Sequence, residues 1–294
     1  DLEKISVYAR VAPEHKIRIV NAWQAKGKIV GMSGDGVNDA PALKQADIGI
    51  AMGITGSEVS KDAADMILTD DNFATIVKAV TVGRNIFTNI KNAIKYLLTG
   101  NTGAIFVVIA TTLLAFFDTK YVVPFAAIQL LFINLVTDSL PAIAIGTEPG
   151  TDEVLKQSPR DPKEPILTRS TFTAILIEAG LIAIAVFIGY YIGINTGEGY
   201  ATTFAFLVLC LARLFNGFSC RSDLPLTKIG LFTNKNTIIA FLIGIALVSV
   251  IIFIPAIGSI FKVMPLSGIQ ILIIVGLALA PTIVVQIIKI IRNR

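Results

Sequence analysis

Carboxylate and amide side chains crowd a short glycine-rich segment near the start of the chain. Asp35 lies between Gly34 and Gly36, and Asn38 and Asp39 follow in the same segment. Glycine lets a backbone approach an anionic group closely. Hard oxygen ligands of this kind suit magnesium, which keeps several waters and bridges to a phosphate. The segment therefore predicts a magnesium and phosphate site.

A second group of polar side chains interrupts a long apolar run. Asn134, Thr137 and Asp138 are spaced by three and four residues, which predicts that they share one face of a helix. Pro141 removes a backbone hydrogen bond, so we expect a loosened helix whose carbonyls face a cavity. A polar seam between helices would explain Asn134 and Thr137. It explains Asp138 poorly, because an acid inside an apolar run indicates an ion site.

The glycine-rich segment belongs to a region with mixed polar and apolar residues. Short strands at 6–11, 28–35, 47–52 and 66–68 alternate with helical stretches such as 13–24 and 38–46. This alternation predicts a parallel sheet with helices on its faces. Ligands bind at the carboxyl ends of such strands, where Asp35 lies.

The remainder of the chain is too apolar for a soluble protein. Of 294 residues, 54% are hydrophobic and 16% charged, and the mean hydropathy is +0.73. Runs long enough to cross about 30 Å of hydrocarbon lie at 94–117, 122–145, 172–194, 201–218, 237–257 and 269–291.

Basic residues predict the orientation of these six spans. They gather after the second and fourth spans, at Lys156, Arg160, Lys163, Arg169, Arg221, Lys228 and Lys235, and Lys289, Arg292 and Arg294 close the chain. The positive-inside rule therefore places the N-terminal region and the C-terminus in the cytoplasm. The chain starts with Asp1 and has no signal-like segment, so we expect further sequence upstream. Cys210 and Cys220 lack a paired spacing, so neither a disulfide nor a zinc site is expected.

Residues 34–41 (GDGVNDAP) resemble the hinge-side signature of P-type ATPases, which are haloacid-dehalogenase-like phosphotransferases. Lys16, in the run APEHK, matches the lysine that contacts the phosphoryl group in that family. The resemblance covers essentially the whole chain. It implies a partial α/β haloacid-dehalogenase-like (Rossmann-like) domain followed by an all-α bundle of six transmembrane helices. Its expected parts are the C-terminal part of the phosphorylation domain at 1–80, a stalk at 81–93 and the transmembrane domain at 94–294.

The resemblance also implies roles for the glycine-rich segment. Asp35 would coordinate Mg²⁺, and Lys16 and Asn38 would hold the phosphoryl oxygens. Asp39, also assigned to the cofactor site, would hydrogen-bond within the loop. These roles are electrostatic, because phosphoryl transfer needs charge neutralised on the transferring oxygens. The nucleophilic aspartate of the family's Asp-Lys-Thr-Gly motif does not occur in the sequence, so this fragment alone is not expected to hydrolyse ATP.

The calcium-transporting branch of the family carries the run from Asn134 to Pro141, and Asn101 matches a further ligand of that branch. The resemblance thus implies ATP-driven export of Ca²⁺ through a phosphorylated aspartate, with Asn101, Asn134, Thr137 and Asp138 as calcium ligands. Calcium takes six to eight oxygens, so an upstream helix would supply the rest. The implied partners are the actuator and nucleotide-binding domains, the first four transmembrane helices and the lipid bilayer, but no nucleic acid.

Other functions stay open at this point. Within the family, the cation could be sodium, potassium or a proton. A membrane-anchored phosphatase would need only the phosphoryl loop, and Asp138 argues against it. A passive channel would need no phosphoryl loop, and Lys16 with Asp35 argues against that. Compact loops and a short C-terminus are compatible with the plasma membrane of a bacterium.

Two departures from the two-site members of the family predict one calcium per cycle. Those members carry a glutamate where this chain has Ala104, and an acid where alignment through Asn216 places Arg213. A missing acid and an added cation would oppose a second divalent ion. Alternatively, Arg213 snorkels to the interface. Asp138 could pair with Arg213 or carry a proton back as the counter-ion.

A continuous helix is predicted to connect the two regions. Helical pattern runs from a cap at Asn72 through Arg84 into the first span. Arg84 and Asn101 would lie roughly 25 Å apart along it, far enough to carry rigid-body movement to the ion ligands. The proline-rich loop at 159–165 resembles the family's cytoplasmic connection that packs near this stalk.

Overall fold

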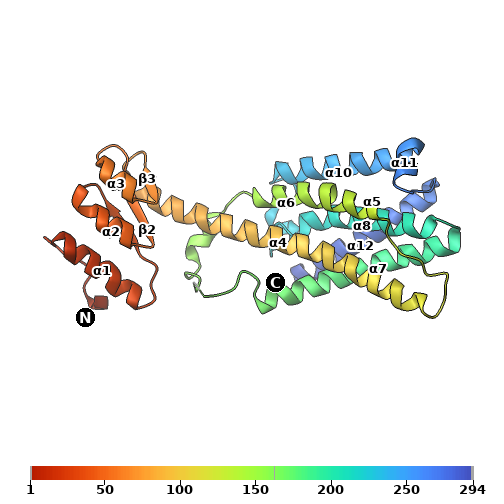
Figure 1. Ribbon diagram of the computed structural model, residues 1–294, viewed down its shortest axis with the longest axis horizontal. Helices are drawn as coiled ribbons and strands as arrows, with labels where there is room; N and C mark the ends of the chain where they lie inside the picture. The colour runs from red at the N-terminus through yellow and green to blue at the C-terminus, as the bar shows by residue number, and fades with distance from the viewer. Residues whose placement is uncertain (1, 162, 293–294) are drawn as a thin grey trace. The chain divides into compact units, whose positions relative to one another are not determined.

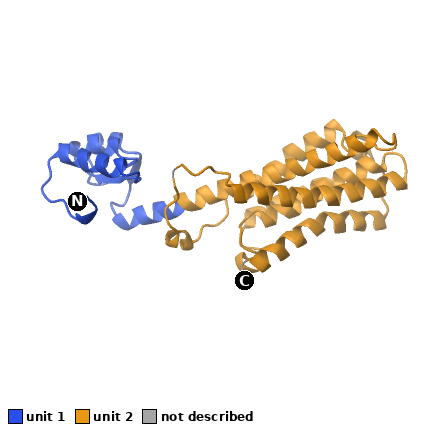
Figure 2. Cartoon of the chain, turned by 90° about the horizontal axis from the view of Figure 1, so that it is seen from below, with its two compact units in different colours: residues 1–82 blue, residues 83–294 orange. Residues whose placement is uncertain are grey.

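The structure is a computed structural model that describes residues 2–161 and 163–292. Pro162 of the proline-rich loop and Arg294 of the basic C-terminus lie outside the described residues. The chain divides into two compact units, Asp1–Val82 and Gly83–Arg294 (Figure 2).

The first unit contains a small parallel sheet. Strands β1 (Gly31–Gly34), β2 (Ile48–Met52) and β3 (Met66–Leu68) pair in the order β1-β2-β3 (Figure 1). Three helices accompany it: α1 (Pro13–Ala25), α2 (Ala40–Gln45) and α3 (Glu58–Ala63). Their core includes the fully buried side chains of Leu43 and Ala51. The helices and the parallel sheet agree with the predicted α/β region.

The strand predicted at 6–11 is wrong. Within the described part of the chain these residues pair with no strand, and the side chain of Val7 is 78% exposed. An extended segment becomes a strand only when a neighbour accepts and donates its ladder hydrogen bonds. The apolar pattern of residues 6–11 carries no information about such a neighbour.

Within residues 2–161 and 163–292, six helices are long and apolar enough to cross a membrane. They are α4 (Phe73–Ala115), the broken helix Ala127–Gly146, α7 (Arg169–Thr196), α8 (Tyr200–Ser219), α10 (Lys235–Phe253) and α12 (Gly268–Arg292). The broken helix consists of α5 (Ala127–Phe132), a π-helical turn (Ile133–Asp138) and α6 (Ser139–Gly146). Short helices α9 (Leu226–Ile229) and α11 (Pro255–Ile260) lie in the connections.

Local chemistry explains where several of these helices begin and end. Asn72 caps α4 as predicted, because its side-chain oxygen accepts from the backbone N–H of Ala74 at 2.9 Å. The predicted stalk, 81–93, lies within the continuous α4. The fifth predicted span, 237–257, is broken, because α10 ends at Phe253 and Pro255 starts α11.

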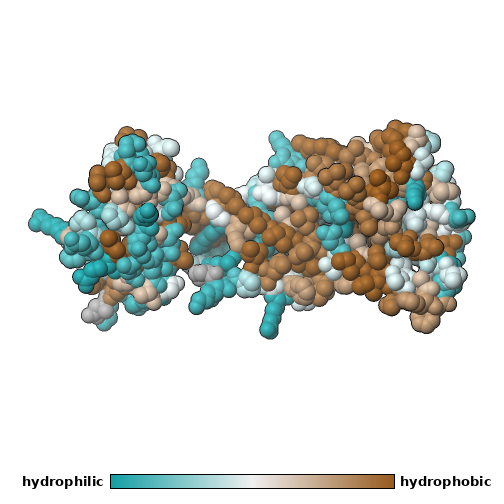
Figure 3. All heavy atoms as spheres, in the orientation of Figure 1, coloured by the Kyte–Doolittle hydropathy of each residue, from teal (hydrophilic) through white to brown (hydrophobic). Residues whose placement is uncertain are grey.

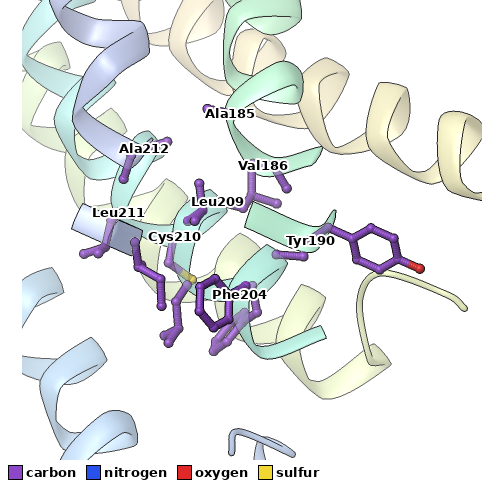
Figure 4. Packing of buried hydrophobic residues seen from close by; sticks show 14 of the residues in the cluster. Ala185, Val186, Tyr190, Phe204, Leu209, Cys210, Leu211 and Ala212 are labelled. Atoms are coloured by element: carbon purple, nitrogen blue, oxygen red, sulfur yellow. The ribbon is translucent and has the colours of Figure 1, made fainter. Parts of the chain in front are cut away.

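Helix α8 forms the centre of the bundle. Its side chains are buried on nearly every face, as expected for a helix that is apolar all round. Figure 4 shows Val186 and Tyr190 of α7 beside Phe204 and Cys210 of α8. The face of the bundle seen in Figure 3 is also largely apolar, and Ile269 on α12 is 74% exposed. Apolar surface of this kind suits contact with lipid tails.

Candidate functional site

The glycine-rich loop joins β1 to α2 through one 3₁₀ turn, Val37–Asp39. The backbone N–H of Gly36 donates to Oδ2 of Asp39 at 3.2 Å, which closes the loop on itself. A Cβ at Gly34 would lie 2.6 Å from the Cβ of Asp39, so only glycine fits there. The loop thus folds around Asp39 rather than around Asp35.

Lys16, in the first turn of α1, pairs with Oδ1 of Asp39. The carboxylate of Asp39 is buried, and burial alone would raise its pKa. The hydrogen bonds from Lys16 and Gly36 outweigh that effect, so the pKa of Asp39 lies below its usual value. Asp39 therefore stays ionised and holds the Lys16 ammonium at the loop.

Asp35 and Asn38 are exposed on the same loop. The backbone carbonyl of Asp35 accepts from the N–H of Ser57 at 2.8 Å and from the hydroxyl of Ser60 at 3.1 Å. Among residues 2–161 and 163–292, its carboxylate forms no hydrogen bond or ion pair. The loop backbone is thus fixed while one carboxylate stays available.

A free carboxylate on a fixed loop fits a magnesium ion. Magnesium usually takes one or two carboxylates and completes its shell with waters and phosphate oxygens. Over the described ranges, no group of three or more His, Cys, Asp and Glu side chains could hold a metal. The exposed carboxylate of Asp35 fits a hydrated metal that shares its shell with a phosphate.

Most of the predicted cation residues line one cavity in the second unit. The cavity measures about 560 Å³ and is bounded by α4, α5, the π-helical turn and α8. Its polar lining consists of Asn101, Asn134, Asp138 and Arg213, and Ala104 adds an uncharged wall. The structure thus brings together residues that are up to 112 positions apart in the sequence.

Arg213 extends from α8 directly into this group. Its Nη1 donates to both carboxylate oxygens of Asp138, at 2.6 and 2.5 Å, and its Nη2 donates to Oδ1 of Asn101 at 3.1 Å. Arg213 is 1% exposed, so it does not snorkel to the membrane surface. Its Nε is buried without a hydrogen-bond partner in the described part of the chain. The guanidinium therefore occupies the cavity as a fixed cation.

The helix widens at the cation residues, in the π-helical turn Ile133–Asp138. A π turn holds more residues than an α turn, so Asp138 lies above Asn134 while Thr137 is rotated away. Thr137 does not line the cavity, and its hydroxyl donates to the carbonyl of Ile133 at 2.9 Å. The expected common face thus holds for Asn134 and Asp138 only.

Pro141 lacks the N–H that would bond the carbonyl of Thr137, four residues earlier. The prediction that the freed carbonyl faces a cavity is wrong for the carbonyl of Thr137. The hydroxyl of Tyr96 donates to it at 2.6 Å, and Tyr96 is buried. A buried carbonyl without a partner costs about 1–3 kcal/mol, which explains why α4 supplies a tyrosine here.

Gly100 was not among the predicted residues, yet it sets the position of Arg213. A Cβ at Gly100 would lie 2.8 Å from Nε and 3.0 Å from Cζ of Arg213. The guanidinium therefore reaches Asp138 only because α4 has no side chain at that point. The sequence signal is a glycine one residue before Asn101, but a helical glycine alone does not reveal what crosses it.

We expect Gly100→Ala to displace Arg213 and to destabilise the bundle by about 1–3 kcal/mol, the usual cost of overpacking. The midpoint of thermal unfolding measures this. Gly180→Ala on α7 is the matched control, because a Cβ there meets nothing within 4 Å. A Gly100→Ala variant as stable as that control would contradict the close approach.

Comparison with known proteins gives one matching family model and several similar relatives. The family model described as "Cation transporting ATPase, C-terminus" matches residues 122–291. A calcium-transporting ATPase of Listeria monocytogenes is 49% identical over 295 residues, which cover 100% of this chain and 33% of that protein. Calcium-transporting ATPase 1 of Lactococcus lactis is 46% identical, with the same coverage of both proteins. Calcium-transporting ATPase type 2C member 2 of Rattus norvegicus is 38% identical, over 98% of the chain and 30% of the rat protein.

The chain spans about a third of the length of these curated relatives. Its six apolar helices and the family match identify it as part of an integral, multi-pass membrane protein. Because the family model covers more than half of the chain, the chain belongs to the cation transporting ATPases, in the C-terminal region of that family.

Proposed function

We propose that the complete protein exports calcium across a membrane, driven by ATP through a phosphorylated aspartate. Relatives named as calcium-transporting ATPases in bacteria and in a mammal support the transported ion. The observation that carries the proposal is the cavity lined by the oxygen-bearing side chains of Asn101, Asn134 and Asp138. A membrane-anchored phosphatase would have no use for this cavity.

The first unit would supply the phosphoryl-binding part of a haloacid-dehalogenase-like domain. Lys16, held by Asp39, would neutralise charge on the phosphoryl oxygens, and Asn38 would donate a hydrogen bond to them. Mg²⁺ would be held by Asp35, and when bound it supplies positive charge at the transferring phosphate. Asp39 acts on Lys16 and the loop, because both of its oxygens already accept hydrogen bonds.

The nucleophilic aspartate, the actuator domain, the nucleotide-binding domain and four further membrane helices would come from the rest of the pump. We propose residues 1–80 as the end of the phosphorylation domain, 81–93 as a stalk and 94–294 as the transmembrane part. Both ends of the chain would face the cytoplasm, most simply at a bacterial plasma membrane. Calcium ligands beyond Asn101, Asn134 and Asp138 would lie on an upstream helix, and Thr137 would keep the π turn in shape.

Arg213 limits the pump to one calcium per cycle in this proposal. Its charge lies within hydrogen-bonding distance of Asp138 and Asn101, and Ala104 offers no carboxylate to offset it. A second divalent ion in the same cavity would meet that charge at low dielectric, where repulsion amounts to several kcal/mol. A proton is the candidate counter-ion. Asp138 can release Arg213 only if another positive charge balances its carboxylate, and a proton would supply that charge.

Helix α4 would transmit movement to the cation ligands. Arg84 on α4 donates to the carbonyls of Val154 and Gln157, at 2.7 and 2.9 Å. The Arg160 guanidinium stacks over the Phe87 ring, 4.2 Å from its centroid. These contacts attach the connection between α6 and α7 to the stalk, in agreement with the predicted packing of that loop.

The transported ion is tested most directly by the cation that stimulates ATP hydrolysis of the complete protein. We expect stimulation by micromolar Ca²⁺ and none by Na⁺, K⁺ or a change of pH alone. Stimulation by a monovalent ion without Ca²⁺ would identify one of the other branches of the family.

A further inference from the structure

A second cavity of about 490 Å³ lies between α4, α7 and α12, away from the cation residues. Lys91 and Lys95 of α4 line it beside the start of the first apolar run, and Ser170 lies in the first turn of α7. Arg292 is the last residue of α12. The cavity is thus formed where the apolar segments of three membrane helices start or stop. In a membrane this is the level of the lipid headgroups.

The lining of this cavity carries an excess of positive charge. Lys91, Lys95, Lys289 and Arg292 face two carboxylates, Glu178 and Asp223. Both carboxylates point to the same lysine, because Lys95 Nζ lies 2.7 Å from Glu178 Oε1 and 3.9 Å from Asp223 Oδ1. Three other cations line the cavity, and two of them can meet a further anion.

Those two are Lys91 and Arg292, which form no ion pair within residues 2–161 and 163–292. Lys289, by contrast, donates to the backbone carbonyls of Ser219 and Ser222, at 2.5 and 2.6 Å. Lys91 is half-buried and Arg292 exposed, so an anion could reach both. The exposed hydroxyl of Ser170 adds a third donor.

One wall of the same cavity is apolar, formed by Ala174, Ile177, Val285 and Ile288. Ile177 is 53% exposed and Ile288 47%. A free phosphate gains nothing from such a wall. A phospholipid satisfies both halves, because its phosphodiester needs donors and its acyl chain needs apolar surface.

We propose that this cavity binds an anionic phospholipid, with its phosphodiester between Lys91 and Arg292 and an acyl chain along Ile177 and Ile288. Basic pockets between transmembrane helices hold lipid headgroups by the same combination of charge and depth. Occupancy would bridge α4 to α12 through Lys91 and Arg292.

The test measures binding of phosphatidylglycerol to the complete pump, by native mass spectrometry and by titration with lipid in neutral detergent. We expect the double variant Lys91→Gln and Arg292→Gln to bind it about tenfold or more weakly. The matched control is Lys156→Gln with Lys163→Gln, which removes the same charge from exposed positions outside the cavity. The control should bind as the unaltered protein does.

Two further arms identify the ligand. Phosphatidylcholine should bind far more weakly than phosphatidylglycerol, and inorganic phosphate should not displace the lipid. Equal lipid affinity in the two double variants would overturn the proposal. Displacement by inorganic phosphate would overturn it as well, since it would mark a site for the free ion. All of these readouts are independent of calcium transport.

Discussion

Replacing Asp35 with alanine is expected to reduce ATP turnover of the complete pump by about 1,000-fold, with no loss of folding. Preorganised charge at a transferring phosphoryl group contributes about 100- to 1,000-fold for a single group. The Asp35 carboxylate is exposed and forms no hydrogen bond or ion pair in the described residues, so its removal leaves no buried group without a partner. Calcium-stimulated phosphate release and the thermal midpoint measure the two halves of this expectation.

Asp62→Ala is the matched control, because Asp62 is exposed at α3 and lies outside the glycine-rich loop. Asp39→Ala should also block turnover, but it leaves Lys16 without its partner and is expected to lower stability too. Near-normal turnover in Asp35→Ala would remove this carboxylate from the magnesium site. A low thermal midpoint would instead assign it a structural role.

Asp138→Asn is expected to raise the calcium concentration for half-maximal activation by about 100-fold while leaving ATP affinity unchanged. The substitution removes the carboxylate of the cavity and the counter-charge of Arg213. Loss of one member of a buried charged pair costs about 2–5 kcal/mol, and 100-fold corresponds to about 3 kcal/mol. Calcium titrations of ATP hydrolysis, with nucleotide binding measured separately, distinguish the two effects.

Because an unpaired buried arginine can also destabilise the fold, a second variant is needed. Asp138→Asn combined with Arg213→Gln removes both charges, so it should restore stability without restoring calcium activation at low concentration. Asp118→Asn makes the same substitution in the loop after α4, where the carboxylate pairs with exposed Lys120. That control should activate normally, and unchanged calcium dependence in Asp138→Asn would exclude Asp138 from the site.

Patterns along the sequence were sufficient for most of the fold. Run length and hydropathy located all six apolar helices, because a membrane span is defined by its own composition. Two features were missed because they depend on details beyond average composition. Pro255 breaks the fifth span within an otherwise continuous apolar run, and residues 6–11 have a strand pattern without a pairing partner.

For the cation residues, the sequence predicted the identity of the residues but not their contacts. Types and spacing were enough to nominate Asn101, Asn134 and Asp138, but three outcomes for Arg213 stayed open until its contacts were known. The ion pair with Asp138 depends on Gly100, whose missing side chain makes room for the guanidinium. Such approaches between distant segments leave no periodic signal in one sequence.

The number of calcium ions moved per ATP tests the central claim most directly. Complete pump reconstituted into sealed vesicles would be given labelled calcium and ATP, and transported calcium would be compared with released phosphate during the first seconds. A cavity that already contains the Arg213 cation predicts a ratio near one. A ratio near two would contradict it, because the second ion would then share the cavity with Arg213.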